Sequence, residues 1–317
     1  MKTVRVAVVG AGSFGRSHVR VIGQLENIEL VAIVDTDLEK ARQVASDHRS
    51  QAFADIEEAS DLVDAAIVAT PTITHESIAT HLLENGVDVL VEKPIAASST
   101  AGESLARLAK TRRRILQVGH LERFNPAVEA LEKALTIPLF FEVHRLSIFT
   151  PRSLDIDVVL DLMIHDLDIV LSFVKQMPEE IRAAGISVLS SQVDIANVRL
   201  AFPNGCVANL TASRVSTEKI RKLRVFQPSE YISVDYQRQD AVRLTVKGGE
   251  ISFEQLATVR AEPLQLELAA FFDAVRSRTS PRVDGFQAAN ALLVAEAILA
   301  NIKEHADLVS ETIRRRN

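Results

Sequence analysis

Apolar and polar positions follow two alternating periods over the first 120 residues. Short apolar runs, typical of buried strands, are separated by stretches in which apolar positions recur every three or four residues, as in helices. The runs are Val4–Val9, Glu29–Val34, Ala65–Ala69, Asp88–Val91 and Ile115–Val118, with helical stretches near 14–25, 37–47, 74–85 and 99–111. This alternation predicts a doubly wound parallel sheet that binds ligands at the carboxyl ends of its strands.

The pattern changes after Gly119. A short helical stretch and a strand near 139–147 are followed by a long apolar helix, Val158–Val174, and then by seven alternating runs. The turns between these runs include Pro203-Asn204-Gly205 and Gly248-Gly249, which suit hairpins. We therefore expect an α+β domain with a large open, mostly antiparallel sheet. Two helical stretches, near 264–277 and 285–305, close the chain. We expect them to cover this sheet or to return to the first domain.

The first apolar run ends in a glycine-rich turn, Gly10-Ala11-Gly12-Ser13-Phe14-Gly15, which opens a helical pattern. Gly10 permits the turn, Gly12 lets the backbone approach a pyrophosphate, and Gly15 lets the helix pack against the strand. Asp35 ends the second apolar run, where a carboxylate accepts hydrogen bonds from an adenosine ribose and repels a 2′-phosphate. The sequence predicts an NAD-binding Rossmann domain at residues 1–120 and a substrate-binding and oligomerisation domain at 121–317. A glycine turn that binds nothing is the alternative.

Composition narrows the class of protein. The 317 residues suffice for two domains, and a net charge of −6 argues against a nucleic-acid partner. The single cysteine, Cys206, excludes an internal disulfide and fits a reducing compartment. No apolar run reaches the length of a membrane span, so we expect no membrane partner and a cytoplasmic location.

Two further motifs contain residues suited to catalysis. Lys93, in Glu92-Lys93-Pro94, stands at the carboxyl end of a predicted strand, where it faces the cofactor crevice and binds or deprotonates a hydroxyl. A solvated surface lysine is the alternative. In the long apolar helix, Asp161, His165, Asp168 and Ser172 fall within a stripe about 60° wide, and Asp166 lies outside it. A histidine beside a carboxylate suits a general base, with a structural histidine as the alternative. We expect no metal, because no further His or Cys stands at metal-ligand spacing.

These motifs resemble, in order, the glucose-fructose oxidoreductase/inositol dehydrogenase/MocA family. The resemblance rests on the glycine turn, Thr70-Pro71 with His75, Glu92-Lys93-Pro94, and Asp161 with His165. It implies nicotinamide-dependent oxidation of a sugar or polyol hydroxyl, and homodimers or homotetramers formed through the open sheet. It also implies Lys93 and His165 as the catalytic pair, with Asp161 near the substrate. Residues implied to line the cofactor are Thr70, Pro71, His75 and Glu92.

Residues 118–126, 151–153 and 157–166 resemble a narrower group, the bacterial UDP-N-acetylglucosamine 3-dehydrogenases. That resemblance implies a 3-keto nucleotide sugar for lipid A synthesis, with an aminotransferase acting next. The candidate substrate contacts are Lys93, His120, Arg123, Asn125, Arg145, Arg152, Asp161 and His165, and Arg214 is a further candidate for the pyrophosphate. Many members of the wider family have an aromatic residue where His120 stands. Alternative functions are dehydrogenation of UDP-N-acetylglucosaminuronic acid, of a free sugar or of inositol, and NAD sensing without turnover.

Overall fold

The structure is a computed structural model that describes residues 3–150 and 156–316. The chain forms two compact units. The first contains Met1–Phe124 and Glu262–Ala289, and the second contains Asn125–Ala261 and Asn290–Asn317. The expected boundary at residue 120 therefore leaves out Glu262–Ala289, which belongs to the first unit because its apolar helix packs in the core of that unit.

Six parallel strands form the sheet of the first unit, in the order β3-β2-β1-β4-β5-β6. Their bounds are β1 (Val4–Val9), β2 (Ile28–Val34), β3 (Gln51–Phe53), β4 (Ala65–Val68), β5 (Asp88–Glu92) and β6 (Leu116–Gly119). The strand order reverses beside β1, and that reversal creates a crevice at the carboxyl ends of the strands. The predicted doubly wound parallel sheet is confirmed. Strand β3 was not predicted, because its three residues are too few to form a recognisable apolar run.

The helices of the first unit follow the predicted stretches closely. They are α1 (Ser13–Ile22), α2 (Leu38–His48), α3 (His75–Glu84), α4 (Ser99–Arg112) and α7 (Pro263–Ser277). Polar side chains fix the beginnings of two of them: Asp37 accepts a hydrogen bond from the Lys40 N–H of α2, and Ser98 accepts one from the Ala101 N–H of α4. Helix α7 buries Leu264, Leu268, Phe271 and Phe272 in the same core as β1 and α1.

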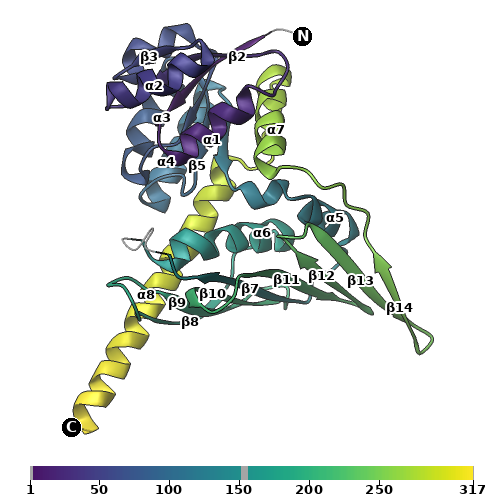
Figure 1. Ribbon diagram of the computed structural model, residues 1–317. Helices are drawn as coiled ribbons and strands as arrows, with labels where there is room; N and C mark the ends of the chain where they lie inside the picture. Colours follow the sequence, from purple (N-terminus) through teal and green to yellow (C-terminus); the bar gives the residue numbers. More distant parts are fainter. Residues whose placement is uncertain (1–2, 151–155, 317) are drawn as a thin grey trace. The chain divides into compact units, whose positions relative to one another are not determined.

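Eight strands form the sheet of the second unit, in the order β14-β13-β12-β11-β7-β10-β9-β8 (Figure 1). Their bounds are β7 (Phe140–Ile148), β8 (Glu180–Ile186), β9 (Ile195–Ala201), β10 (Val207–Ser216), β11 (Ile220–Gln227), β12 (Glu230–Asp235), β13 (Asp240–Lys247) and β14 (Glu250–Gln255). Neighbouring strands are antiparallel except β7 and β10, which are parallel. The predicted mostly antiparallel sheet is confirmed.

Helices cover one face of this second sheet. They are α5 (Pro126–Ala134), the π-helical turn η5 (Val159–Met163), α6 (Ile164–Val174) and part of α8 (Gly285–Arg316). Alternate strand residues such as Phe141 and Val143 complete their core. On the other face Phe226 lies 5.6 Å from Phe140 and 4.9 Å from Tyr231, measured between ring centres. We expect this uncovered face to meet a second subunit, and that expectation stays a prediction.

One helix among the described residues is long and apolar enough to cross a membrane, by length and composition alone. It is the segment Gly285–Leu308 of α8, and 50% of its most apolar window is buried inside the protein. Val294, Ala295 and Ile298 of this helix belong to the core of the second unit. The helix therefore has a packing role in the fold.

Candidate active site

The glycine turn between β1 and α1 presents backbone to a ligand. Gly10 has a φ of +102°, and a Cβ there would lie 2.5 Å from the Ala69 oxygen. A Cβ on Gly15 would lie 1.8 Å from the Gly10 oxygen, so the fold itself requires both glycines. Gly12 differs, because a Cβ there would meet no atom within 4 Å. The open space beside Gly12 suits the close approach of a pyrophosphate.

Asp35 is held in a fixed position next to this turn. Its Oδ2 accepts a hydrogen bond from the Ala11 N–H at 2.8 Å, and its Oδ1 accepts one from the Asp37 N–H at 2.9 Å. A cleft of about 510 Å³, a common size for a small-molecule site, is lined by Asp35 together with Gly10, Gly12, Thr70, Pro71 and the apolar Ile56 and Ile78. A carboxylate for the ribose and apolar walls for the purine fit the adenosine end of NAD.

His75 joins the loops that follow β4 and β5. Its side chain is buried, with Nε2 2.9 Å from the main-chain oxygen of Thr70 and Nδ1 2.8 Å from the main-chain oxygen of Pro94. Thr74 donates a hydrogen bond from Oγ1 to the Thr70 Oγ1 at 2.8 Å. His75 therefore holds the two loops in place, and the cleft that contains Asp35 is lined by Thr70 but not by His75.

A buried carboxylate fixes the backbone at Lys93. Glu92 Oε1 lies 2.7 Å from His18 Nε2, and Glu92 Oε2 accepts a hydrogen bond from the Lys93 N–H at 3.3 Å. Gly119 ends the neighbouring strand β6, and a Cβ there would lie 2.7 Å from Glu92 Oε2. Glycine at position 119 thus leaves room for the carboxylate. His18 was not predicted as part of the site, because its helical position resembles that of a core residue.

A second buried acid, Glu267 of α7, lies near this group. Its side chain is 0% exposed, and neither carboxyl oxygen has a hydrogen-bond partner among the described residues. Burial raises the pKa of Glu267 well above its usual range, and the negative charge of Glu92 raises it further. Burial and the neighbouring charge therefore both favour the protonated, neutral form of Glu267. The sequence analysis gave Glu267 no role, because Glu92 is far from it along the chain.

The segment with Asp161 and His165 begins with the π-helical turn η5. Such turns bond from residue i to i+5, so their side chains do not follow the 100° spacing assumed for an α-helix. Asp161 and His165 are both partly exposed, whereas Asp168 is buried. The expected polar stripe thus includes one buried carboxylate, that of Asp168. π-Helical turns are frequent at functional sites, which agrees with the presence of this turn beside the predicted base.

Arg145 and Asp166 form a buried ion pair in the second unit. Arg145 is 1% exposed, and it donates from Nε to Asp166 Oδ2 at 2.6 Å and from Nη2 to Oδ1 at 2.8 Å. Tyr236 donates its hydroxyl hydrogen to Asp166 Oδ1 at 3.2 Å, and its ring lies 5.1 Å from the guanidinium. The pair is bidentate, which is the strongest geometry for such contacts. The predicted substrate contact at Arg145 thus has a structural partner and almost no exposed surface.

The other predicted substrate residues differ in their surroundings. Asn125 caps α5, because its Oδ1 accepts a hydrogen bond from the Ala127 N–H at 3.1 Å. Its side-chain amide also donates a hydrogen bond to the main-chain oxygen of Tyr236 at 3.0 Å. His120 and Arg123 are buried. Arg152 lies outside the described residues. A substrate role for these four residues stays a prediction.

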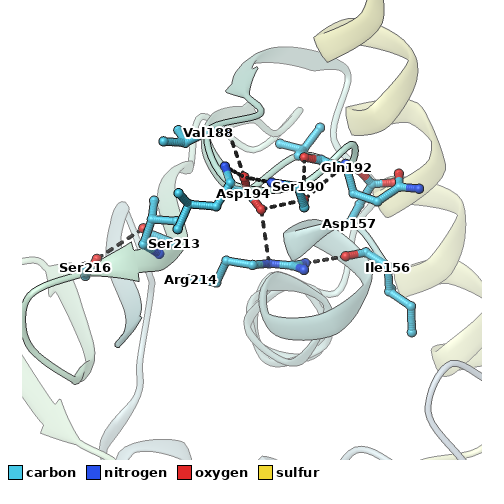
Figure 2. Close-up of polar contacts among 12 residues, drawn as sticks. Ile156, Asp157, Val188, Ser190, Gln192, Asp194, Ser213, Arg214 and Ser216 are labelled. Atoms are coloured by element: carbon cyan, nitrogen blue, oxygen red, sulfur yellow. Dashed lines mark hydrogen bonds and ion pairs between the residues drawn. The ribbon is translucent and has the colours of Figure 1, made fainter. Parts of the chain in front are cut away.

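Asp194, which the sequence analysis did not single out, organises the loop between β8 and β9 (Figure 2). It is 0% exposed, and its Oδ2 accepts hydrogen bonds from the N–H groups of Val188, Leu189 and Ser190 at 2.6 to 3.0 Å. Burial alone would raise the pKa of Asp194, but these bonds and one from the Ser190 hydroxyl lower it to about 2. The carboxylate is therefore charged down to strongly acidic pH.

Arg214 extends this network to the residues that precede η5. Its Nε lies 3.8 Å from Asp194 Oδ1, and its Nη2 donates to the Ile156 oxygen (Figure 2). The Val193 N–H donates to Asp157 Oδ1 at 2.8 Å. Arg214, which the sequence suggested as a phosphate contact, therefore binds Asp194 and the backbone that precedes the helix of the predicted base, His165.

The described residues contain no group of three or more His, Cys, Asp or Glu side chains placed to hold a metal ion. Cys206 is buried, and burial raises the pKa of its thiol to about 11. Its thiol is therefore protonated at neutral pH, a state that suits neither metal binding nor nucleophilic attack.

The parallel sheet, the glycine turn and the cleft at Asp35 define a dinucleotide-binding domain of the Rossmann type. Residues 4–120 match a family model described as an oxidoreductase family with an NAD-binding Rossmann fold, and residues 141–227 match the GFO/IDH/MocA C-terminal domain. The chain belongs to the Gfo/Idh/MocA oxidoreductase family, as its motifs suggested, and is an NAD-dependent dehydrogenase acting on CH–OH groups.

Several relatives match the chain over nearly its full length. A UDP-N-acetylglucosamine 3-dehydrogenase from Acidithiobacillus ferrooxidans is 33% identical over 301 residues, which cover 92% of this chain and 95% of the relative. A solved structure of that enzyme matches with a TM-score of 0.91 at 32% identity, covering 96% of this chain and 99% of the other. Inositol 2-dehydrogenase 1 from Saccharopolyspora erythraea is 30% identical over 94% of this chain and 93% of its own.

Proposed function

We propose that the enzyme oxidises the 3-hydroxyl of UDP-N-acetylglucosamine to a ketone. The observation that carries this proposal is the similarity, over almost the whole length of both chains, to a UDP-N-acetylglucosamine 3-dehydrogenase. The inositol dehydrogenases match at 30% identity or less over a comparable length, and they make a polyol the second candidate substrate. In the proposed pathway the 3-keto sugar passes to an aminotransferase, for lipid A synthesis in the cytoplasm.

Lys93 and His165 perform the proton chemistry in this proposal. NAD, when bound, accepts a hydride from the carbon that bears the hydroxyl. His165 removes the hydroxyl proton, because an imidazole titrates near neutral pH. The Lys93 ammonium stabilises the negative charge that develops on the oxygen. The Glu92 carboxylate supports this role by fixing the backbone at Lys93.

Recognition of the UDP group needs cations near the pyrophosphate. Arg145 and Arg214 are paired with Asp166 and Asp194 in the structure, so neither guanidinium is the first choice. The proposal therefore assigns the phosphate contacts to Arg123 and Arg152, and contacts with the sugar to His120, Asn125 and Asp161. A charge-removing substitution of Arg123 is expected to raise KM for the nucleotide sugar and to leave the affinity for NAD unchanged.

The first experiment measures reduced nicotinamide by absorbance, with purified enzyme, NAD and UDP-N-acetylglucosamine. A carbonyl trap or the coupled aminotransferase removes the ketone, because its formation is expected to be unfavourable at equilibrium. An increase with the nucleotide sugar, and none with free N-acetylglucosamine, supports the proposal. Turnover of UDP-N-acetylglucosaminuronic acid or inositol instead would replace the substrate and retain the reaction class.

Lys93→Met tests the residue assignment. The substitution keeps a long apolar stem and removes the ammonium, so we expect kcat to fall at least 10³-fold while NAD still binds. Lys133→Met is the matched control, because Lys133 is exposed on α5. Turnover of the Lys93 variant at the control rate would refute the assignment.

His165→Gln tests the proposed base. The substitution is expected to remove the pH dependence of kcat that this imidazole confers. A pH dependence that persists would identify Lys93 as the base.

We further propose that the enzyme forms a homodimer or homotetramer through the uncovered face of its second sheet. Support comes from the aromatic group on that face, in which Phe226 is 38% exposed and Phe140 and Tyr231 are partly exposed, since aromatic side chains are enriched at protein interfaces. Light scattering of the purified chain tests this assembly. Phe226→Arg is expected to yield monomers, and an unchanged mass would exclude this face as the interface.

A further inference from the structure

A second pocket opens in the first unit, at the sheet edge opposite the cofactor cleft. It has a volume of about 660 Å³ and lies between the end of α4, the start of β6, the loop after α7 and the start of α8. The cofactor cleft contacts the carboxyl ends of β1 and β2, whereas this pocket contacts Leu116 at the amino end of β6. Because all six strands are parallel, the two pockets lie at opposite edges of one sheet.

The lining of this pocket is strongly cationic. Lys110, Arg113, Arg114 and Arg278 line it, and Asp284 is the one carboxylate in the lining. The chain as a whole has a net charge of −6, so the local excess of positive charge is opposite in sign to that of the protein. Such an excess attracts anions, and it does so more strongly in a concave site than on a flat surface.

In the part of the chain that the structure describes, the side chains of Lys110, Arg113 and Arg114 do not bind the terminal carbonyl groups of helices α4 and α7. Cations near a helix C-terminus often serve its terminal carbonyl groups. Here the main-chain N–H groups of Arg113 and Arg114 donate to the main-chain oxygens of Lys110 and Ala109, respectively. The main-chain oxygen of Arg113 accepts a hydrogen bond from Arg278 Nη2 at 2.7 Å. The side chains of Lys110, Arg113 and Arg114 make no hydrogen bond or ion pair to another described residue, so three cations are available to a ligand.

The remaining lining suits an anion that has a carbon framework. Asp284 accepts a hydrogen bond from the Gln287 N–H at 2.9 Å, so this carboxylate serves as the cap of α8. The amino end of α8, at Gly285, adds the positive end of a helix dipole to the pocket. Apolar surface comes from Ala106, Leu116 and Phe286.

We propose that this pocket binds a small phosphate-bearing molecule. The three cations contact the phosphate oxygens, and the apolar wall contacts any organic part. The site is separate from the NAD cleft, and the proposal does not depend on which sugar the enzyme oxidises.

Isothermal titration of the full chain with inorganic pyrophosphate, under saturating NAD, tests the proposal. NAD fills the cofactor cleft, and saturating UDP is added to fill the proposed pyrophosphate contacts of the substrate, so the remaining binding reports the second pocket. We expect one pyrophosphate per chain, with at least tenfold weaker binding for Arg113→Gln and for Arg114→Gln, since each loses a charge-assisted contact. Arg112→Gln is the matched control: this exposed neighbour lies 3.7 Å from Glu84, is not in the lining, and loses the same charge.

Each result of the titration has a defined meaning. Absence of pyrophosphate binding to the NAD-saturated chain would overturn the proposal, as would equal losses in the Arg112 control and the two pocket variants. A second titration with ADP identifies the source of the phosphate. Tighter binding of ADP than of pyrophosphate, lost in the same two variants, indicates an organic phosphate. Weaker or equal binding indicates the free anion.

Discussion

Replacing Asp194 by Asn should destabilise the second unit by about 2 kcal/mol at pH 7. The Asp194 pKa is lowered from an ordinary value of 3.8 to about 2 in the folded chain. A shift of that size corresponds to roughly 2 kcal/mol of stabilisation of the folded state. This contribution is fully present above pH 4 and is lost as the pH falls from 4 to 2, because the unfolded chain takes up its proton first. Asparagine has no charge to stabilise, so its stability should change less over that pH range.

Denaturant unfolding of the wild type and Asp194→Asn, at pH 7 and at pH 2.5, measures this difference. Hydrogen exchange at the Val188, Leu189 and Ser190 amides reports the same loss locally, since these groups donate to the carboxylate. Asp307→Asn is the matched control, because Asp307 is exposed on α8. The reasoning is refuted if the Asp194 variant unfolds at the control midpoint at pH 7, or if its deficit is as large at pH 2.5 as at pH 7.

Three further predictions follow from buried groups. Glu267→Gln should gain stability relative to the wild type as the pH rises from 5 to 8, because the raised pKa of Glu267 means that unfolding releases its proton above about pH 4.5; unfolding midpoints at both pH values check the trend. Gly119→Ala should lower kcat more than NAD affinity, because the added Cβ would lie 2.7 Å from Glu92 Oε2 and displace the carboxylate that holds Lys93; steady-state kinetics and NAD titration separate the two effects. Cys206 should stay unmodified by iodoacetamide at pH 8 in the native enzyme and react after unfolding, since burial raises its pKa to about 11; mass spectrometry detects the adduct.

Local patterns predict most of the fold. The five apolar runs of the first domain correspond to β1, β2, β4, β5 and β6, because a strand buried on both faces is apolar throughout. The alternating runs correspond to the second sheet, since a half-buried strand has period two. One strand escaped prediction, and the placement of one segment stayed open between two alternatives. Strand β3 is too short to show a pattern, and the assignment of Glu262–Ala289 to the first unit depends on packing between segments far apart in sequence.

The cofactor end of the site was predictable, because the groups that bind the cofactor lie in a short continuous turn and at the ends of strands. The glycine turn and Asp35 lie on neighbouring strands β1 and β2, and a parallel sheet brings the ends of such strands together. The supporting groups were harder to predict. His18 contacts Glu92 from a helix, and Arg214 contacts Asp194 from another strand, so neither contact follows from spacing along the chain.

Charged residues on apolar faces nevertheless contain usable information. Arg145 alternates with Phe141 and Val143 on the buried face of β7, and Asp166 lies among apolar residues of α6. Burying an ion costs several kcal/mol unless the ion is paired. Two residues of opposite charge that both lie on buried, apolar faces therefore predict an ion pair between them. Glu267 is also misplaced on an apolar helix face, but its charged neighbour is Glu92. A like-charged neighbour excludes pairing, and the remaining way to avoid the cost is to keep the proton. The same rule thus predicts an ion pair at Arg145 and, at Glu267, a carboxyl group whose protonated form is favoured.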